Sequence, residues 1–103
     1  MIRKLVRDRV PDIIRADGLD PVTTVATDGE YRRELRAKLG EETTEYLEAD
    51  EDSAAEELAD IVEVVRALAA LHGLTPEGLE EIRAGKAAER GGFAGRVIWH
   101  GER

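Results

Sequence analysis

Apolar residues recur along most of this chain at intervals of three or four positions, the spacing of a buried stripe on a helix. Glycines that are typical of helix ends divide the pattern into segments, namely Gly18, Gly73 and Gly91. Together these signals predict helices over residues 10–16, 30–49, 53–72 and 76–89. The expected fold class is therefore all-α, in one domain over residues 1–103.

Three of the predicted helix starts carry residues that are typical of N-terminal caps. Asp8 is expected to cap the first helix. Ser53, with Glu56 three residues later, matches a capping box for the third helix. Thr75 followed by Pro76 predicts the start of the fourth helix, because proline is favoured at the first helical position.

Two short stretches rich in β-branched residues lie outside the helices, at 22–26 and 96–100. The first follows the turn signal Asp20-Pro21, and the second follows Gly91-Gly92. We expect the two stretches to pair as a minor two-strand element beside the helices.

The predicted helix at 53–72 is apolar on most of its faces, as in a helix from the middle of a bundle. A chain of 103 residues buries only a modest core, and its other helices can hardly cover such a helix. We therefore expect a helical hairpin with flanking helices that forms a four-helix-type bundle in a homodimer, or in a tetramer.

The distribution of charge changes this picture. Eleven carboxylates lie between Glu41 and Glu63, whereas no Lys or Arg lies between Leu39 and Val65. The net charge of the whole chain is −8, although the residues outside this block include 12 acidic and 15 basic ones. Because the excess charge is acidic and local, we expect no binding to a nucleic acid polymer.

Other function classes are excluded by what the sequence lacks. There is no Cys, so disulfides, thiolate metal sites and a Cys nucleophile are ruled out. No apolar run has the length of a signal peptide or of a membrane-spanning helix. From these features we expect a cytoplasmic protein with no membrane partner.

Two spaced patterns of acids lie within the acidic block, Glu41-Glu42-x-x-Glu45 and Glu57-x-x-Asp60. Acids three residues apart project from one face of a helix, where their like charges repel. The patterns fall on consecutive helices joined by a short turn, so an antiparallel hairpin would set them opposite each other. Carboxylate ligands favour Mg²⁺ or Mn²⁺, while solvated acidic helix faces are the structural alternative.

These patterns resemble the signature of the all-α nucleoside triphosphate pyrophosphatases, which include MazG-like, dimeric dUTPase-like and phosphoribosyl-ATP pyrophosphohydrolase-like enzymes. The segments Lys4–Ile14 and Glu89–Phe93 are similar to the two ends of a compact MazG-related subgroup. The resemblance thus covers nearly the whole chain. Eleven residues separate Glu45 from Glu57, at or just below the short end of the family's usual gap, which implies a tight turn.

The resemblance implies hydrolysis of nucleoside triphosphates between the α- and β-phosphates, giving a monophosphate and pyrophosphate. A house-cleaning role, in which the enzyme removes non-standard nucleotides, would fit this reaction. The resemblance also implies Mg²⁺, with Mn²⁺ as a substitute, held by Glu42, Glu45, Glu57 and Asp60. The catalytic group that it implies comprises Glu41, Glu42 and Glu45, with Glu41 positioning water or a neighbouring ligand.

A triphosphate also needs cations near its β- and γ-phosphates. Lys38 lies one turn before Glu42 on the same helix face and is expected either to contact phosphate or to pair with the acids. Arg7, Lys86 and Arg90 lie in the segments that resemble the family. We expect them to contact phosphate, the alternative being surface charges or partners of the acidic block.

Two other functions stay open at this point. One is the hydrolysis of phosphoribosyl-ATP in histidine biosynthesis, and the Lys4–Ile14 segment leans against it. The other is a non-catalytic helical module that retains the acids and binds a metal, a nucleotide or a partner protein. The intact acids at every position of the motif favour an enzyme.

Overall fold

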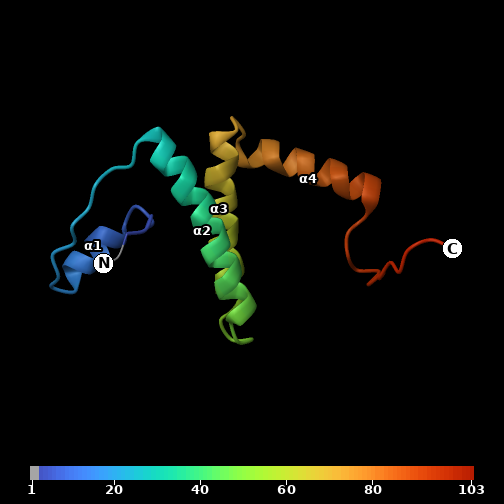
Figure 1. Ribbon diagram of the computed structural model, residues 1–103, viewed down its shortest axis with the longest axis horizontal. Coiled ribbons are helices and arrows are strands. Elements are labelled where there is room, and N and C mark those ends of the chain that lie inside the picture. The colour runs from blue at the N-terminus through green and yellow to red at the C-terminus, as the bar shows by residue number, and fades with distance from the viewer. Residues whose placement is uncertain (1–2) are drawn as a thin grey trace.

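The computed structural model describes residues 3–103 and forms four helices over that range (Figure 1). In chain order the helices are α1 (Val10–Ala16), α2 (Asp28–Glu48), α3 (Ala54–Leu71) and α4 (Pro76–Arg90). The all-α prediction is confirmed, and each predicted helix is found with its ends shifted by no more than two residues.

Helices α2 and α3 form an antiparallel hairpin, which is the most extensive contact between helices in the described chain (Figure 1). Residues 49–53 make the tight turn between them. Asp50 stabilises this turn, because its Oδ1 accepts hydrogen bonds from the backbone N–H and the hydroxyl of Ser53, both at 3.0 Å. The hairpin therefore sets the middle of α2 against the first half of α3.

Thr27 caps the start of α2 with a complete capping box. Its Oγ1 accepts a hydrogen bond from the backbone N–H of Glu30 at 3.2 Å. Its own backbone N–H donates to the Glu30 carboxylate at 3.0 Å. This Thr-x-x-Glu pattern explains why α2 begins two residues before the predicted position. At the start of α4, Thr75 accepts from the Gly78 N–H at 3.0 Å and confirms the predicted cap.

Two predicted caps were wrong. The N-cap of α1 is Arg9, and no side chain caps that helix, so Asp8 does not have the expected role. Ser53 is the N-cap residue of α3 at the predicted position, but its hydroxyl donates to Asp50 in the turn, and the predicted capping box with Glu56 does not form. A short polar side chain can bond to either of two nearby partners, and here the turn is the stronger competitor.

Glycines end α1 and α3 as expected. Gly18 and Gly73 have φ values of +85° and +78°, a left-handed conformation that glycine adopts without strain. After α3, the N–H of Gly73 donates to the carbonyl of Ala70, and the N–H of Leu74 donates to that of Ala69, both at 3.0 Å. These two bonds satisfy carbonyls that the helix itself leaves unpaired.

The predicted two-strand element was wrong: residues 3–103 contain no strand. The stretch 22–26 connects α1 to α2 on one side of the hairpin, whereas 96–100 follows α4 on the other side (Figure 1). The two stretches therefore cannot pair within one chain. The preference of β-branched residues for strands depends on packing against a neighbour, and here Val22 is 97% exposed.

The buried core is small for the length of the chain. In the described part, its buried apolar residues are Leu35, Val64 and Ala69. The radius of gyration is 17.8 Å, compared with roughly 13 Å for a compact domain of about 100 residues. The difference arises because α4 and the segment after it extend away from the hairpin (Figure 1).

The hairpin carries apolar side chains that none of residues 3–103 covers. Leu47 on α2 is 75% exposed, and Leu58 and Val62 on α3 are about half exposed. The hairpin also has a groove that is lined by residues of both helices, including Gly40 and Thr43 of α2 and Leu68 of α3. None of the helices described is both long and apolar enough to cross a membrane.

The capping box at α2 makes a prediction about stability. Replacing Thr27 with Ala removes the acceptor for the Glu30 N–H, so we expect the free energy of unfolding to fall by about 1 kcal/mol. Urea denaturation followed by circular dichroism measures this change. Thr23→Ala is the matched control, because Thr23 is exposed in the irregular segment before α2. An equal decrease in the free energy of unfolding of the two variants would contradict the role of Thr27 as the cap of α2.

Candidate metal centre

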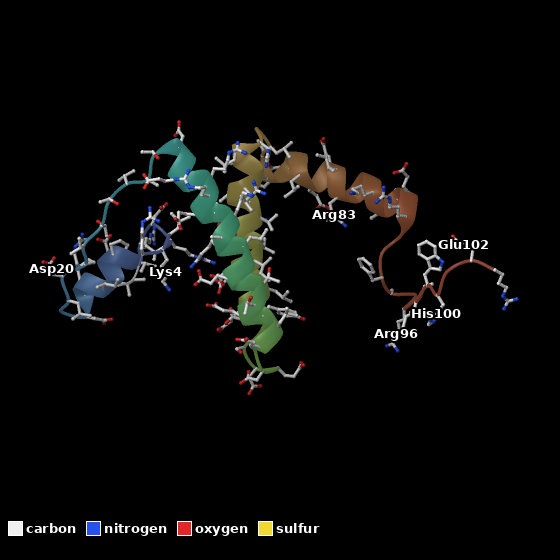
Figure 2. All side chains as sticks on the ribbon, viewed as in Figure 1. Lys4, Asp20, Arg83, Arg96, His100 and Glu102 are labelled. Carbon is white, nitrogen blue, oxygen red and sulfur yellow. The ribbon has the colours of Figure 1, made fainter. Side chains whose placement is uncertain are left out.

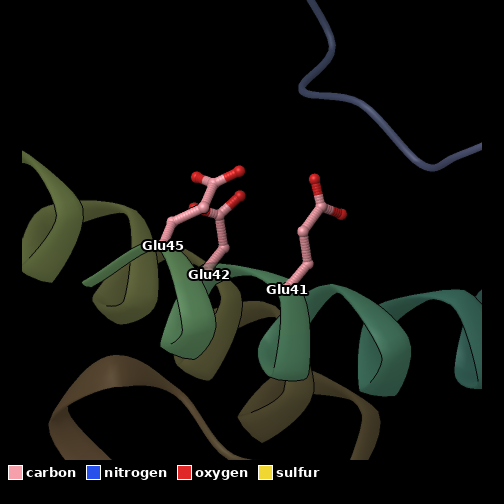
Figure 3. A group of neighbouring side chains, drawn as sticks. All are labelled: Glu41, Glu42 and Glu45. Atoms are coloured by element: carbon pink, nitrogen blue, oxygen red, sulfur yellow. The ribbon is translucent and has the colours of Figure 1, made fainter. Parts of the chain in front are cut away.

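Three carboxylates of α2 project from the same side of the helix (Figure 3). Glu41, Glu42 and Glu45 each offer an oxygen atom within 4.8 Å of the oxygens offered by the other two. Glu45 lies three residues after Glu42 and four after Glu41, and residues at these two spacings are neighbours on a helix face, so Glu45 joins the other two groups.

Two carboxylates of α3 complete the group from the opposite helix. Oxygen atoms of Glu57 and Asp60 lie within 4.8 Å of each other and of an oxygen of Glu42. Glu42 thus belongs to both sets and joins them. The structure brings together all five acids that the sequence patterns singled out, and we refer to them as the acid cluster: Glu41, Glu42, Glu45, Glu57 and Asp60.

Glu42 is the buried charge at the centre of the acid cluster, with only 6% of its surface exposed. Its Oε1 lies 3.3 Å from Nζ of Lys38, but its buried Oε2 has no hydrogen-bond partner among the described residues. Oε2 of Glu57 is likewise buried without a partner there. Leaving such an acceptor unsatisfied costs about 1–3 kcal/mol, so a cation that met these oxygens would be strongly stabilised.

The environment of Glu42 disfavours its ionised form. Burial raises the pKa of its carboxyl above the ordinary value, and the negative charge of Glu45 raises it further. Lys38 acts in the opposite direction through its hydrogen bond and its charge, without cancelling the effect of burial. The chain's own cations therefore neutralise this carboxylate only in part.

Lys38 occupies the position that the sequence predicted, on the α2 face that carries the acids. Its Nζ lies 3.5 Å from Glu41 and 3.3 Å from Glu42, and its side chain is largely buried. Of the two roles left open by the sequence, pairing with the acids is the one that this structure contains. A lysine held in this way remains beside any anion that approaches the acid cluster.

The N-terminal segment, residues 3–9, brings two further cations to the acid cluster. Nζ of Lys4 lies 3.8 Å from Glu41, and Nη2 of Arg7 lies 2.6 Å from Asp60. This segment and the hairpin line an open cavity of about 570 Å³ that includes Lys38, Glu42 and Asp60 in its wall. Sequence reasoning did not select Lys4 for the site, and the irregular backbone of this segment has no periodicity that would have pointed to it.

Lys86 and Arg90 do not reach the acid cluster within one chain. Both lie on α4, which leaves the end of the hairpin and runs away from it. Figure 2 shows the separation through two labelled residues, with Lys4 on one side of the hairpin and Arg83 of α4 on the other. Within residues 3–103, neither Lys86 nor Arg90 forms an ion pair, so their predicted phosphate contacts stay a prediction.

Comparisons with known proteins found a relative that matches only part of the chain. No protein-family model matches the sequence. The chain is 50% identical over 52 residues to an uncharacterized protein of Mycolicibacterium smegmatis, a match that covers 50% of this chain. The match spans 53% of the length of that protein, so the chain corresponds to about half of this curated relative. No solved structure matches. Arguments about function therefore depend on the geometry of the acid cluster.

The unpartnered charge of Glu42 predicts that the isosteric Glu42→Gln variant is more stable than the wild type when no divalent cation is present. At pH 7 we expect a gain of about 1 kcal/mol, because the variant removes a buried carboxylate and its repulsion from Glu45. Denaturation in the presence of a chelator measures it. Glu48→Gln, at an exposed position on the same helix, is the control and should change little.

The stability that Glu42→Gln gains over the wild type should decrease as the pH is lowered. The pKa of Glu42 is raised in the folded state, so the wild type loses its penalty as the pH falls through that pKa toward 4.5, the ordinary value. The advantage of Glu42→Gln should therefore be largest at neutral pH and disappear near pH 4.5. A variant less stable than the wild type at every pH would show that the carboxylate is adequately paired.

Proposed function

We propose that this protein is a Mg²⁺-dependent nucleoside triphosphate pyrophosphohydrolase that cleaves between the α- and β-phosphates. The observation that carries the proposal is the pair of buried oxygens, Oε2 of Glu42 and Oε2 of Glu57, that have no partner in the described chain. They lie where the acids of α2 meet those of α3. Buried carboxylates without partners are unfavourable in a fold unless a ligand compensates them.

The residues of the acid cluster fit a hard divalent cation. Glu42, Glu45, Glu57 and Asp60 offer oxygen atoms only, which suits Mg²⁺ or Mn²⁺ better than Zn²⁺. When bound, the ion would neutralise the acids, polarise the phosphate oxygens and promote the attack of water on phosphorus. Without a cation, the acid cluster would repel a triphosphate.

The chain's own residues supply the remaining functions. Glu41 lies at the edge of the acid cluster and is only half-buried, so it is suited to orient the attacking water or to accept its proton. Lys38, Lys4 and Arg7 each pair with an acid of the cluster, so they are placed to meet the oxygens of a polyphosphate bound there. Their positive charges would stabilise the pyrophosphate as it leaves.

The cellular role in this proposal is the removal of non-standard nucleotides in the cytoplasm. Phosphoribosyl-ATP is a second substrate that carries the same polyphosphate group. A non-catalytic module would use the same acids to bind a metal or a nucleotide without turnover. These alternatives differ in a single assay, because only the enzymes release pyrophosphate.

The decisive assay measures pyrophosphate release from a panel of standard and modified nucleoside triphosphates and from phosphoribosyl-ATP, with Mg²⁺ and with chelator. We expect Mg²⁺-dependent release that falls by about 100-fold or more in Asp60→Ala, because the variant removes a proposed ligand. Glu48→Ala, outside the acid cluster, should retain activity. No release from any substrate by folded, Mg²⁺-saturated wild type would contradict the proposal and favour a binding module.

We also propose that the protein works as a homodimer, in which two hairpins form a four-helix-type bundle, or as a tetramer of such units. The accessible surface of the chain is 9186 Å², about 3,400 Å² more than the roughly 5,800 Å² of a compact monomer of this length. Two such chains together expose about 6,800 Å² of excess surface, and obligate dimers bury roughly 2,000–5,000 Å² or more in total. In such an assembly, Lys86 and Arg90 would be available to the site of a second copy.

The exposed apolar face of the hairpin predicts which substitution disrupts the dimer. Val62→Glu places a charge on that face, so we expect the protein to shift toward monomers by light scattering at micromolar concentrations. Val22→Glu is the control, because Val22 lies outside the helices and is already almost fully exposed. A monomeric wild type, or an equal shift in both variants, would contradict this assembly.

A further inference from the structure

An ion pair connects the N-terminal segment to the acid cluster across 53 positions of sequence. Nη2 of Arg7 donates to Oδ1 of Asp60 at 2.6 Å, the shortest contact that any cation makes with the cluster. Both side chains are roughly half exposed, so the pair can open without disturbing the core. In the proposed function, Asp60 is also one of the four metal ligands.

Independent contacts hold the N-terminal segment in place on the hairpin. Arg3 bonds to Glu30 at 3.0 Å and to Glu34 at 2.6 Å, on the first half of α2 and outside the acid cluster. Figure 3 shows this segment, in blue, passing on the side toward which Glu41, Glu42 and Glu45 point. Release of Arg7 from Asp60 would therefore leave its guanidinium beside the site.

We propose that Arg7 is the internal counter-cation of Asp60 and that a divalent cation displaces it. A metal ion bound to Asp60 would lie beside the guanidinium that contacts its Oδ1, and the repulsion between the two cations makes them compete for this carboxylate. Once displaced, Arg7 is free to bind the phosphate groups of the substrate. This inference rests on the proposed function, because it takes Asp60 to be a metal ligand.

The exchange gives Arg7 two effects of opposite sign. Arg7 weakens metal binding, because the metal must first break the ion pair. It strengthens the binding of a polyphosphate to the metal-loaded protein, because the released guanidinium offers paired N–H donors to phosphate oxygens. A residue that only held the N-terminal segment in place would not separate these two affinities.

Calorimetric titration with Mn²⁺ alone tests the first effect. An exposed ion pair contributes up to about 1 kcal/mol, so Arg7→Ala should bind Mn²⁺ about two- to fivefold more tightly than the wild type. Arg3→Ala is the matched control, because it removes a contact of the same segment outside the acid cluster and should leave the affinity unchanged. Equal or weaker Mn²⁺ binding by Arg7→Ala would overturn the proposal.

Titration of the Mn²⁺-saturated proteins with inorganic triphosphate tests the second effect. Arg7→Ala should bind triphosphate about tenfold more weakly than the wild type, and Arg7→Lys should recover part of the loss. Arg15→Ala is the control here, because Arg15 pairs with Asp12 on α1 and contacts neither the acid cluster nor the hairpin, so this variant should behave as the wild type. If the wild type and Arg7→Ala bind triphosphate with the same affinity, the proposed binding of phosphate by the released Arg7 is overturned.

The wild-type protein provides a test that requires no altered chain to fold. In ¹⁵N spectra of the arginine side chains, titration with Mg²⁺ should shift the Arg7 Nε–H signal and leave that of Arg3 unchanged. An unshifted Arg7 signal at saturating Mg²⁺ overturns the exchange. Binding of Mn²⁺ without pyrophosphate release would refute only the enzymatic proposal, whereas no binding by the wild type would refute both.

Discussion

Repulsion among five carboxylates is the constraint that the rest of this structure has to accommodate. Two helices meet so closely that Glu42 contributes to both halves of the acid cluster while it is almost completely buried. Lys38 from the same helix and the N-terminal segment from outside the hairpin supply positive charge. These contacts still leave buried oxygens of Glu42 and Glu57 without partners in the described chain, and a divalent cation would resolve the conflict.

Local sequence patterns were sufficient to predict the helices and the acid cluster. Helix ends at Gly18 and Gly73 follow from backbone conformation, which depends on a few neighbouring residues. The meeting of Glu42 with Asp60 follows from helical spacing and from a turn too short for any arrangement other than a hairpin. Such features need no knowledge of distant parts of the chain.

Features that depend on competition or on distant contacts were not predictable in this way. Ser53 had two local partners, and sequence alone does not show that Asp50 would be preferred to the helix start. The stretch 22–26 has the composition of a strand, but no partner strand lies beside it. The sequence offered the acidic block as an alternative partner of Arg7, but only the tertiary arrangement selects Asp60, which lies 53 positions away.

The open shape of the chain fits an account in which the site and the assembly are linked. A hairpin with a small core supports buried carboxylates poorly unless other contacts hold its helices together. In the proposed assembly, a second copy covers the apolar face around Leu58 and Val62, while a cation compensates the acid cluster on another side. Ligand and partner would then both stabilise the same pair of helices.

The most direct test of this account is a crystal structure of the protein grown with Mn²⁺ and measured for anomalous scattering. The account predicts an anomalous peak among the carboxylates of Glu42, Glu45, Glu57 and Asp60, with Arg7 withdrawn from Asp60. A structure at saturating Mn²⁺ that has no peak there, and that retains the contact between Arg7 and Asp60, would contradict it.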